Sequence, residues 1–284
     1  MANLEPLIQS IPVAPLKLAS LEGCRALADQ VNNYLVSFRH ESPTNVGQAD
    51  SLQGYCADSY LLECECPRFG SGEGKGVLKE SVRGCDLFIM VDVTNYSLTY
   101  RVNGYENHMS PDNHYQDLKR IISAADGKAR RINVIMPFLY EGRQHKRSKR
   151  ESLDCALMLQ ELVDMGVSNI LTFDAHDPRV SNSIPLHGFD SFMPTYQFLK
   201  ALVNSVPDFV IDNDHLMIIS PDEGAMGRAV YFSNILGVDM GMFYKRRDYS
   251  TVVNGKNPIV AHEFLGDDVK GKDVIIIDDM ISSG

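Results

Sequence analysis

The chain has 284 residues and a formal net charge of −10 at pH 7, and 44% of its residues are hydrophobic. This length allows two folded domains of ordinary size, and the acidic balance argues against a nucleic-acid partner. No apolar run reaches the ~18 residues of a membrane helix, and the first residues lack a signal-peptide pattern, so we expect no membrane partner. The six cysteines lack a zinc-binding spacing, which indicates reduced thiols in a cytoplasmic protein.

Alternating strand and helix candidates along the chain are typical of an α/β protein. Strands are expected in β-branched and apolar runs at 16–19, 60–66, 76–91, 131–137, 170–173, 216–219, 240–244 and 274–277. Helices are expected from the spacing of apolar residues at 21–38, 117–125, 152–165, 195–203 and 225–237. Polar stretches near 40–60 and 96–115 are predicted to be inserted loops.

A glycine-dense segment, 68–74, precedes the strand candidate at 76–91. Its composition predicts a loop, and a simple hairpin turn would explain the pattern equally well. Two other stretches concentrate positive charge directly after strand candidates, at 142–150 and at 245–247. Each could be a solvated surface, but the ends of parallel strands form the ligand-binding edge of such sheets. We therefore interpret both as candidate anion sites.

Carboxylates and a histidine follow three further strand candidates. Asp174-Ala175-His176 ends one of them, and Ser220-Pro221-Asp222-Glu223-Gly224 ends another, where a plain turn is the alternative interpretation. The last run, Val274–Ile277, predicts a strand buried on both faces. Asp278 and Asp279 come directly after it and suit sugar hydroxyls or a metal ion, and the small residues that can seat a phosphate follow: Ser282, Ser283 and Gly284.

Together these motifs resemble the ribose-phosphate pyrophosphokinase family. Val-Ile-Ile-Ile-Asp-Asp-Met resembles the family's phosphoribosyl-pyrophosphate loop, Ser-Pro-Asp-x-Gly matches directly, and Lys245-x-Arg247 matches the family's Lys-x-Arg. The segments at 69–89 and 137–144 resemble the family's ATP-binding segments. Three family acids are replaced, by Ser71, His145 and Ser282, and Ser283 stands where the family carries Thr.

The resemblance implies a role for each matching residue. ATP would be bound by Phe69, Glu73, Arg143, Gln144 and His176, with Phe69 stacked on adenine. Mg²⁺ would be held near His176 and Asp222, and Lys245 and Arg247 would be catalytic. Ribose 5-phosphate would be bound by Asp278, Asp279, Ser282, Ser283 and Gly284. Family members share the ATP site between subunits, so a homo-oligomer is expected.

The resemblance also implies two type I phosphoribosyltransferase-like domains, each a mainly parallel sheet flanked by helices. Residues 1–192 would form the ATP side, and residues 193–284 would form the ribose 5-phosphate side, truncated at its C-terminus. The strand tips at Phe173, Tyr244 and Ile277 are expected to meet at one cleft.

The implied reaction transfers the β,γ-diphosphoryl group of ATP to the 1-hydroxyl of ribose 5-phosphate. Two alternatives stay open. One is a non-catalytic regulatory homologue, favoured by the replaced acids, and the other is a type I phosphoribosyltransferase, which should lack the ATP segments.

Overall fold

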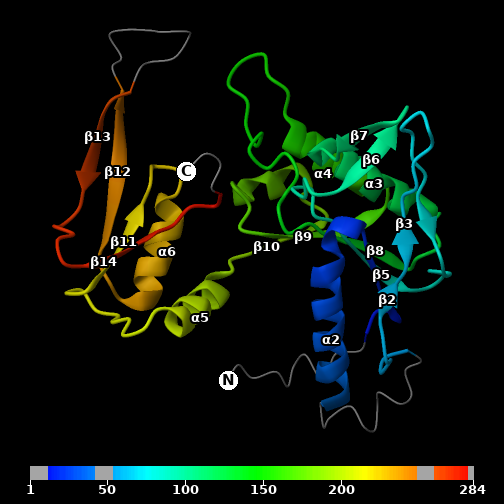
Figure 1. Ribbon diagram of the computed structural model, residues 1–284, viewed down its shortest axis with the longest axis horizontal. Coiled ribbons are helices and arrows are strands. Elements are labelled where there is room, and N and C mark those ends of the chain that lie inside the picture. The colour runs from blue at the N-terminus through cyan, green and yellow to red at the C-terminus, as the bar shows by residue number, and fades with distance from the viewer. Residues whose placement is uncertain (1–11, 42–53, 248–258, 281–284) are drawn as a thin grey trace. The chain divides into compact units, whose positions relative to one another are not determined.

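The computed structural model describes residues 12–41, 54–247 and 259–280, and for 245–247 and 259–262 it describes the backbone alone. The chain divides into two compact units, Met1–Met193 and Pro194–Gly284. Each unit has its own sheet with helices packed against it (Figure 1). Strands and helices alternate in both units, which confirms the predicted α/β class.

The first unit is built on six parallel strands in the order β10-β9-β8-β5-β1-β2. They are β1 (Leu16–Ser20), β2 (Leu61–Leu62), β5 (Asp86–Met90), β8 (Arg131–Ile135), β9 (Val167–Phe173) and β10 (Gly188–Phe192). The chain moves outward from β1 to β2 and then returns to the other side of β1 to form β5. Because every pairing is parallel, all carboxyl ends lie at one edge, where open α/β sheets bind ligands.

Helices cover both faces of this sheet. Alternate residues of β5 belong to two buried clusters, with Leu87 and Ile89 in one and Phe88 and Met90 in the other, as a strand covered on both faces requires. The 3₁₀ helix η1 (Glu22–Cys24) and α2 (Arg25–Glu41) contribute to the smaller cluster. The larger one is filled from α3 (Pro111–Ala124) and α4 (Asp154–Asp164).

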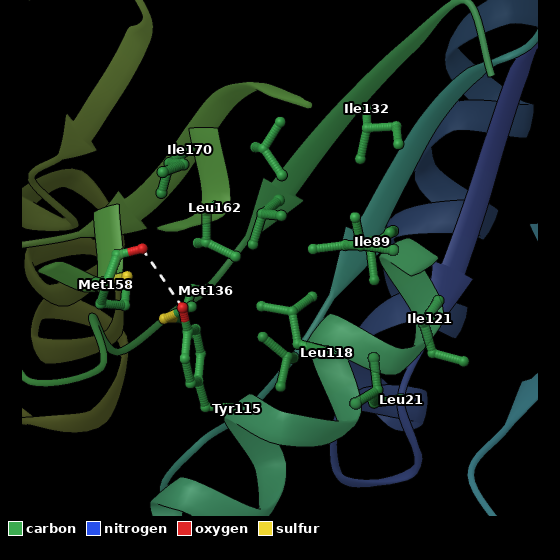
Figure 2. Packing of buried hydrophobic residues seen from close by; sticks show 14 of the residues in the cluster. Leu21, Ile89, Tyr115, Leu118, Ile121, Ile132, Met136, Met158, Leu162 and Ile170 are labelled. Atoms are coloured by element: carbon green, nitrogen blue, oxygen red, sulfur yellow. Dashed lines mark hydrogen bonds between the residues drawn. The ribbon is translucent and has the colours of Figure 1, made fainter. Parts of the chain in front are cut away.

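Figure 2 shows this larger cluster, in which Leu118 of α3 and Leu162 of α4 lie on the same side of the sheet as Ile89. The hydroxyl of Tyr115 donates to the carbonyl of Met158 at 3.4 Å and so links α3 to α4. The 3₁₀ helix η4 (Pro178–Ser183) adds Val180 to the same cluster. A continuous core therefore holds the ligand-binding edge of the sheet in place.

Two short antiparallel pairings lie outside the main sheet: β3 (Cys64–Glu65) with β4 (Val77–Leu78), and β6 (Thr99–Val102) with β7 (Tyr105–His108). The strand predicted over 60–66 is thus divided between β2 and β3. The predicted inserted loop at 96–115 is instead a hairpin followed by the start of α3.

Local signals explain this correction. Asn103 and Gly104 have φ values of 51° and 85°, as a two-residue hairpin turn requires, and Asn-Gly favours that turn. Ser110 caps α3 by accepting a hydrogen bond from the backbone N–H of Asn113 at 3.2 Å, and Pro111 occupies the first helical turn. α3 therefore begins six residues earlier than its apolar spacing alone predicts.

The second unit contains a four-stranded sheet in the order β13-β12-β11-β14. Its elements are α5 (Thr195–Ser205), β11 (Leu216–Ser220), α6 (Met226–Leu236), β12 (Met240–Arg247), β13 (Ile259–Leu265) and β14 (Asp273–Ile276). β12 and β14 run parallel to the fully buried β11, and β13 is antiparallel to β12. α6 ends at Gly237, whose φ of 68° is a common helix terminus. Within the described parts of the chain, no helix is long and apolar enough to cross a membrane.

The prediction that the last strand is buried on both faces is wrong for this structure. Ile275 and Ile277 pack against the core of the second unit, whereas Val274 and Ile276 are 39% and 60% exposed. β14 is an edge strand that pairs with β11, and α6 covers one face of the sheet. Among the described residues, nothing buries the opposite face of β14.

A buried polar network crosses the centre of the first sheet. Arg131 donates to both carboxylate oxygens of Asp86, at 2.8 and 2.5 Å, and Asn133 donates to the same carboxylate at 2.8 Å. Asn169 then donates to the side-chain oxygen of Asn133 at 2.5 Å. The network therefore joins β5, β8 and β9 by side chains in addition to the backbone ladder.

We expect Asp86→Ala to lower the free energy of unfolding by about 2 kcal/mol, because it removes the buried carboxylate that accepts from Arg131 and leaves the buried Asn133 amide without that acceptor. Chemical denaturation of the purified variant measures this. Asp126→Asn is the matched control, since the exposed Asp126–Lys128 pair at 2.7 Å should contribute little. Equal stability losses in the two variants would contradict the role given to the network.

Candidate active site

Arg143 and Gln144 lie in a turn that follows the carboxyl end of β8. Gly142 donates from its backbone N–H to Leu139 at 3.0 Å, and Gln144 donates to Glu141 at 2.8 Å. The Gln144 side chain also donates to the carbonyl of Ser152 at 2.7 Å, which ties the turn to the start of α4. Arg143 is exposed, so its guanidinium can reach an anion, whereas the Gln144 amide group is committed to the loop.

His145 and His176 come together at this edge. Their ring centroids are 5.1 Å apart, and the His145 Nε2 is 3.5 Å from the nearer carboxylate oxygen of Asp177. His176 follows the end of β9, where Asp174 has a φ of 40°, an uncommon conformation for a residue other than glycine. A second imidazole therefore lies beside the histidine that the sequence singles out.

Asp177 organises this cluster, and the sequence analysis missed it. Its carboxylate accepts from the Arg179 side chain at 2.9 and 2.5 Å and from the Arg179 backbone at 3.0 Å. The hydrogen bond from the Arg179 side chain is the main cause that holds the pKa of Asp177 below its usual range. Asp177-Pro178 is a helix-start pattern, so the N-cap of η4 was visible in the sequence although its contact with His145 was not.

The predicted adenine loop, 68–74, is a tight turn in another part of the first unit. Phe69 donates its backbone N–H to Glu73 at 2.7 Å, and the Ser71 hydroxyl donates to the Glu73 carboxylate at 2.8 Å. The Phe69 side chain is 54% exposed, as a ring that stacks on a ligand should be. The contacts of this loop run to α3 and to β6–β7, whereas the ring of His176 lies beside that of His145.

In the second unit, acids follow two adjacent parallel strands. Asp222 comes after β11 and accepts from the backbone N–H of Gly224 at 2.9 Å, which shapes the turn into α6. Asp278 follows β14 and accepts from the backbone N–H of Asp279 at 2.9 Å. The Arg228 guanidinium of α6 lies 4.0 Å from the Asp279 carboxylate, with both side chains largely buried. No sequence motif singled out Arg228.

The negative charge of this cluster affects the pKa of Asp278. Burial, together with the neighbouring carboxylates of Asp279 and Asp222, raises the pKa of Asp278 above its ordinary value. Carboxylates that crowd at one edge in this way bind a cation or hydroxyl hydrogens well, because either relieves their mutual repulsion.

The predicted cations of the second unit extend past the same edge. Ser220, the last residue of β11, pairs with Met242, so β12 continues beyond β11 through Lys245 to Arg247. Lys245 and Arg247 lie inside β12 and pair through their backbones with His262 and Ile259 of β13. The 248–256 loop, Ser282, Ser283 and Gly284 lie outside the described residues.

Within the described residues, no group of three or more His, Cys, Asp or Glu side chains could hold a metal ion by itself. His176 and the carboxylates of Asp222 and Asp278 still fit Mg²⁺, because this ion keeps several waters and usually binds one or two carboxylates together with substrate phosphates.

The family models match most of the chain. Residues 16–166 match the N-terminal domain of ribose phosphate pyrophosphokinase, and residues 199–284 match the phosphoribosyl transferase domain. The chain therefore has the two-domain phosphoribosyltransferase-like architecture. It belongs to the ribose-phosphate pyrophosphokinase family.

Similar proteins agree with this assignment. The chain is 30% identical over 219 residues to a ribose-phosphate pyrophosphokinase of Corynebacterium efficiens and 29% identical over 227 residues to one of Staphylococcus epidermidis. These alignments cover 76% and 78% of this chain, and the chain spans 60% and 62% of the relatives' lengths. The crystal structure of phosphoribosylpyrophosphate synthetase from Mycobacterium smegmatis matches with a TM-score of 0.70 and 24% identity, covering 95% of this chain and 72% of that one, which supports the fold.

We expect the carboxyl of Asp278 to titrate above the ~3.9 of a free aspartate, and Asp222→Asn to move its midpoint to lower pH by removing a nearby negative charge. Between the ordinary and the raised pKa the folded state holds more protons than the unfolded state, so unfolding free energy falls as pH rises. Carboxyl NMR titration measures the midpoint. Asp239→Asn is the control, because Asp239 precedes the amino end of β12 whereas Asp222 and Asp278 follow carboxyl ends. If Asp239→Asn moved the Asp278 midpoint as far as Asp222→Asn does, the effect assigned to Asp222 would be contradicted.

Proposed function

We propose that the protein is a ribose-phosphate diphosphokinase that uses ATP and ribose 5-phosphate to form phosphoribosyl pyrophosphate and AMP. The observation that carries the proposal is the register of the second sheet. Asp222, Asp278 and Asp279 follow adjacent parallel strands, and β12 carries Lys245 and Arg247 past that same edge. Acids for a sugar and cations for a polyphosphate are thus supplied by one edge of one sheet.

In this proposal the second unit performs the transfer. The 1-hydroxyl oxygen of ribose 5-phosphate attacks the β-phosphorus of ATP, and the bond from that phosphorus to the α,β-bridging oxygen breaks. AMP leaves with the bridging oxygen, and the hydroxyl proton passes to solvent. Lys245 and Arg247 neutralise charge that develops on the transferring group, which is the main source of rate in phosphoryl transfer. Asp278 and Asp279 hold the ribose hydroxyls, and Ser282, Ser283 and Gly284 seat the 5-phosphate.

The first unit would bind ATP through Phe69, Glu73, Arg143, Gln144 and His176. Mg²⁺, when bound, would supply positive charge that stabilises the transferring phosphates. His176 of the first unit and Asp222 of the second are its proposed protein ligands, and within the second unit the carboxyl of Asp278 is near enough to that of Asp222 to affect its charge. Because Phe69 is exposed and its loop is anchored on α3, whereas Arg143 lies in the turn after β8, we propose a homo-oligomer in which two subunits complete each ATP site.

We propose a cytoplasmic location on the chemistry of the cysteines. All six are free thiols, and burial raises the pKa of Cys64 to about 11 and that of Cys155 to about 12. Thiols with a raised pKa are poor nucleophiles, which supports a structural role in a reducing compartment.

A non-catalytic regulatory homologue is the second candidate, and the adenine loop favours it. Ser71 replaces a family acid, and its hydroxyl occupies one acceptor site of Glu73 at 2.8 Å. This contact weakens the expected bond from Glu73 to the adenine amino group. Nucleotide binding without AMP release in the presence of ribose 5-phosphate would support this candidate.

We expect Lys245→Ala to lower the rate of ribose 5-phosphate-dependent AMP formation by at least about 100-fold, since one positioned cation is lost at the transferring phosphate. The assay uses the full-length protein with ATP, Mg²⁺ and ribose 5-phosphate. Arg246→Ala is the matched control, because it removes a charge from the same triplet at the position that the family motif leaves open. Near-normal turnover of Lys245→Ala would rule out its proposed role.

A further inference from the structure

The 68–74 loop is closed by its own backbone. Arg68 and Gly74 form an isolated antiparallel bridge, and Gly72 donates to the carbonyl of Phe69 at 2.9 Å. A single turn of this kind is marginally stable by itself, so its orientation depends on what anchors its ends. The residue that precedes Phe69 supplies that anchor.

Arg68 is fixed by a charged network with α3. Its guanidinium donates to both carboxylate oxygens of Asp117, at 2.8 and 2.7 Å, and Arg120 donates to the same carboxylate at 2.5 Å. The side chains of Arg68 and Asp117 are only 10% and 5% exposed. A two-pronged bond of this type fixes direction as well as distance, which a lysine cannot reproduce.

The β6–β7 hairpin supports the loop from another side. The Tyr100 ring lies 5.2 Å from the Arg68 guanidinium, within cation–π range. A Cβ atom at Gly72, where φ is +89°, would lie 2.9 Å from the Val102 side chain, so the hairpin packs directly on the turn. A Cβ atom at Gly74 would lie 2.3 Å from an Arg68 nitrogen. The dense glycines thus make room for the anchor and for the hairpin.

We propose that Arg68 and Asp117 are positioning residues that set the selectivity for adenine, by holding Phe69 and Glu73 in one orientation through the anchored loop. This proposal rests on the proposed function, in which the 68–74 loop binds the adenine base of ATP. Phe69 alone would stack on any base, whereas Glu73 distinguishes the adenine amino group only if the backbone fixes its place. The 96–115 segment, expected to be an inserted loop, contains the β6–β7 hairpin and the first residues of α3. Because Asp117 lies in α3, both elements take part in anchoring the 68–74 loop.

The test compares Arg68→Lys and Asp117→Asn with wild type. Isothermal titration with non-hydrolysable ATP and GTP analogues measures base preference, and steady-state assays measure KM for ATP and kcat. We expect each variant to weaken ATP binding about tenfold, as the loss of one charge-assisted hydrogen bond entails. GTP binding should fall less than ATP binding, since stacking on Phe69 tolerates a shift of the loop that the hydrogen bond from the adenine amino group to Glu73 does not. The KM for ribose 5-phosphate should change less than about twofold, because the second unit is untouched.

Asp126→Asn is the matched control, because it removes a carboxylate next to the other end of α3 and Asp126 pairs with Lys128. Thermal melting identifies a variant that has lost its fold, and Arg68→Lys keeps the test decisive if Asp117→Asn unfolds, because Lys still offers one charged bond. An unchanged ATP-to-GTP preference in folded Arg68→Lys would overturn the proposal. Wild type that binds ATP selectively but forms no AMP would overturn the proposed reaction alone.

Discussion

Parallel strand pairing is the constraint on which both units depend, because it brings the carboxyl ends of consecutive strands to a single edge. In the first unit this edge receives the turn with Arg143 and the pair His145 and His176. In the second it receives Asp222 and Asp278. Within each unit, residues that are far apart in the sequence therefore lie at the same edge of one sheet. The hydrogen bonds from Arg131 to Asp86 join β8 to β5 within the first of these sheets.

The sequence predicted the ends of β9 and β11 well, because β-branched runs and the polar residues after them are local signals, but it did not predict β10 or β13, and β12 extends beyond Tyr244 to Arg247. Predictions from the sequence failed where contacts with distant parts of the chain decide which residues are buried. Val274 and Ile276 resemble buried residues by composition, yet they lie on the exposed side of an edge strand. The hairpin at 99–108 carried an Asn-Gly turn signal that its polar composition obscured.

For the candidate site, single residues could be predicted and their partnerships could not. His176 and Asp278 follow recognisable runs, but the contact of His145 with Asp177 joins residues 32 positions apart, and that of Arg228 with Asp279 joins residues 51 positions apart. Asp117 lies on a helix face whose spacing indicates only that it is near the core. The Asp117 carboxylate accepts hydrogen bonds from Arg68, and no local pattern in a single sequence predicts that pairing.

Charge explains why these partnerships matter in an acidic protein. With a net charge of −10, the chain can attract a polyphosphate only where cations are held apart from acids. Arg143 is exposed after β8, whereas Arg68 and Arg179 are tied to Asp117 and Asp177 by hydrogen bonds. The hydrogen bonds of Arg68 and Arg179 fix the shape of their loops, whereas Arg143 is the arginine that the proposed function assigns to the ligand. His145 contacts Asp177 as Arg179 does, although it stands where the family carries an acid, so this replacement changes how the edge is organised.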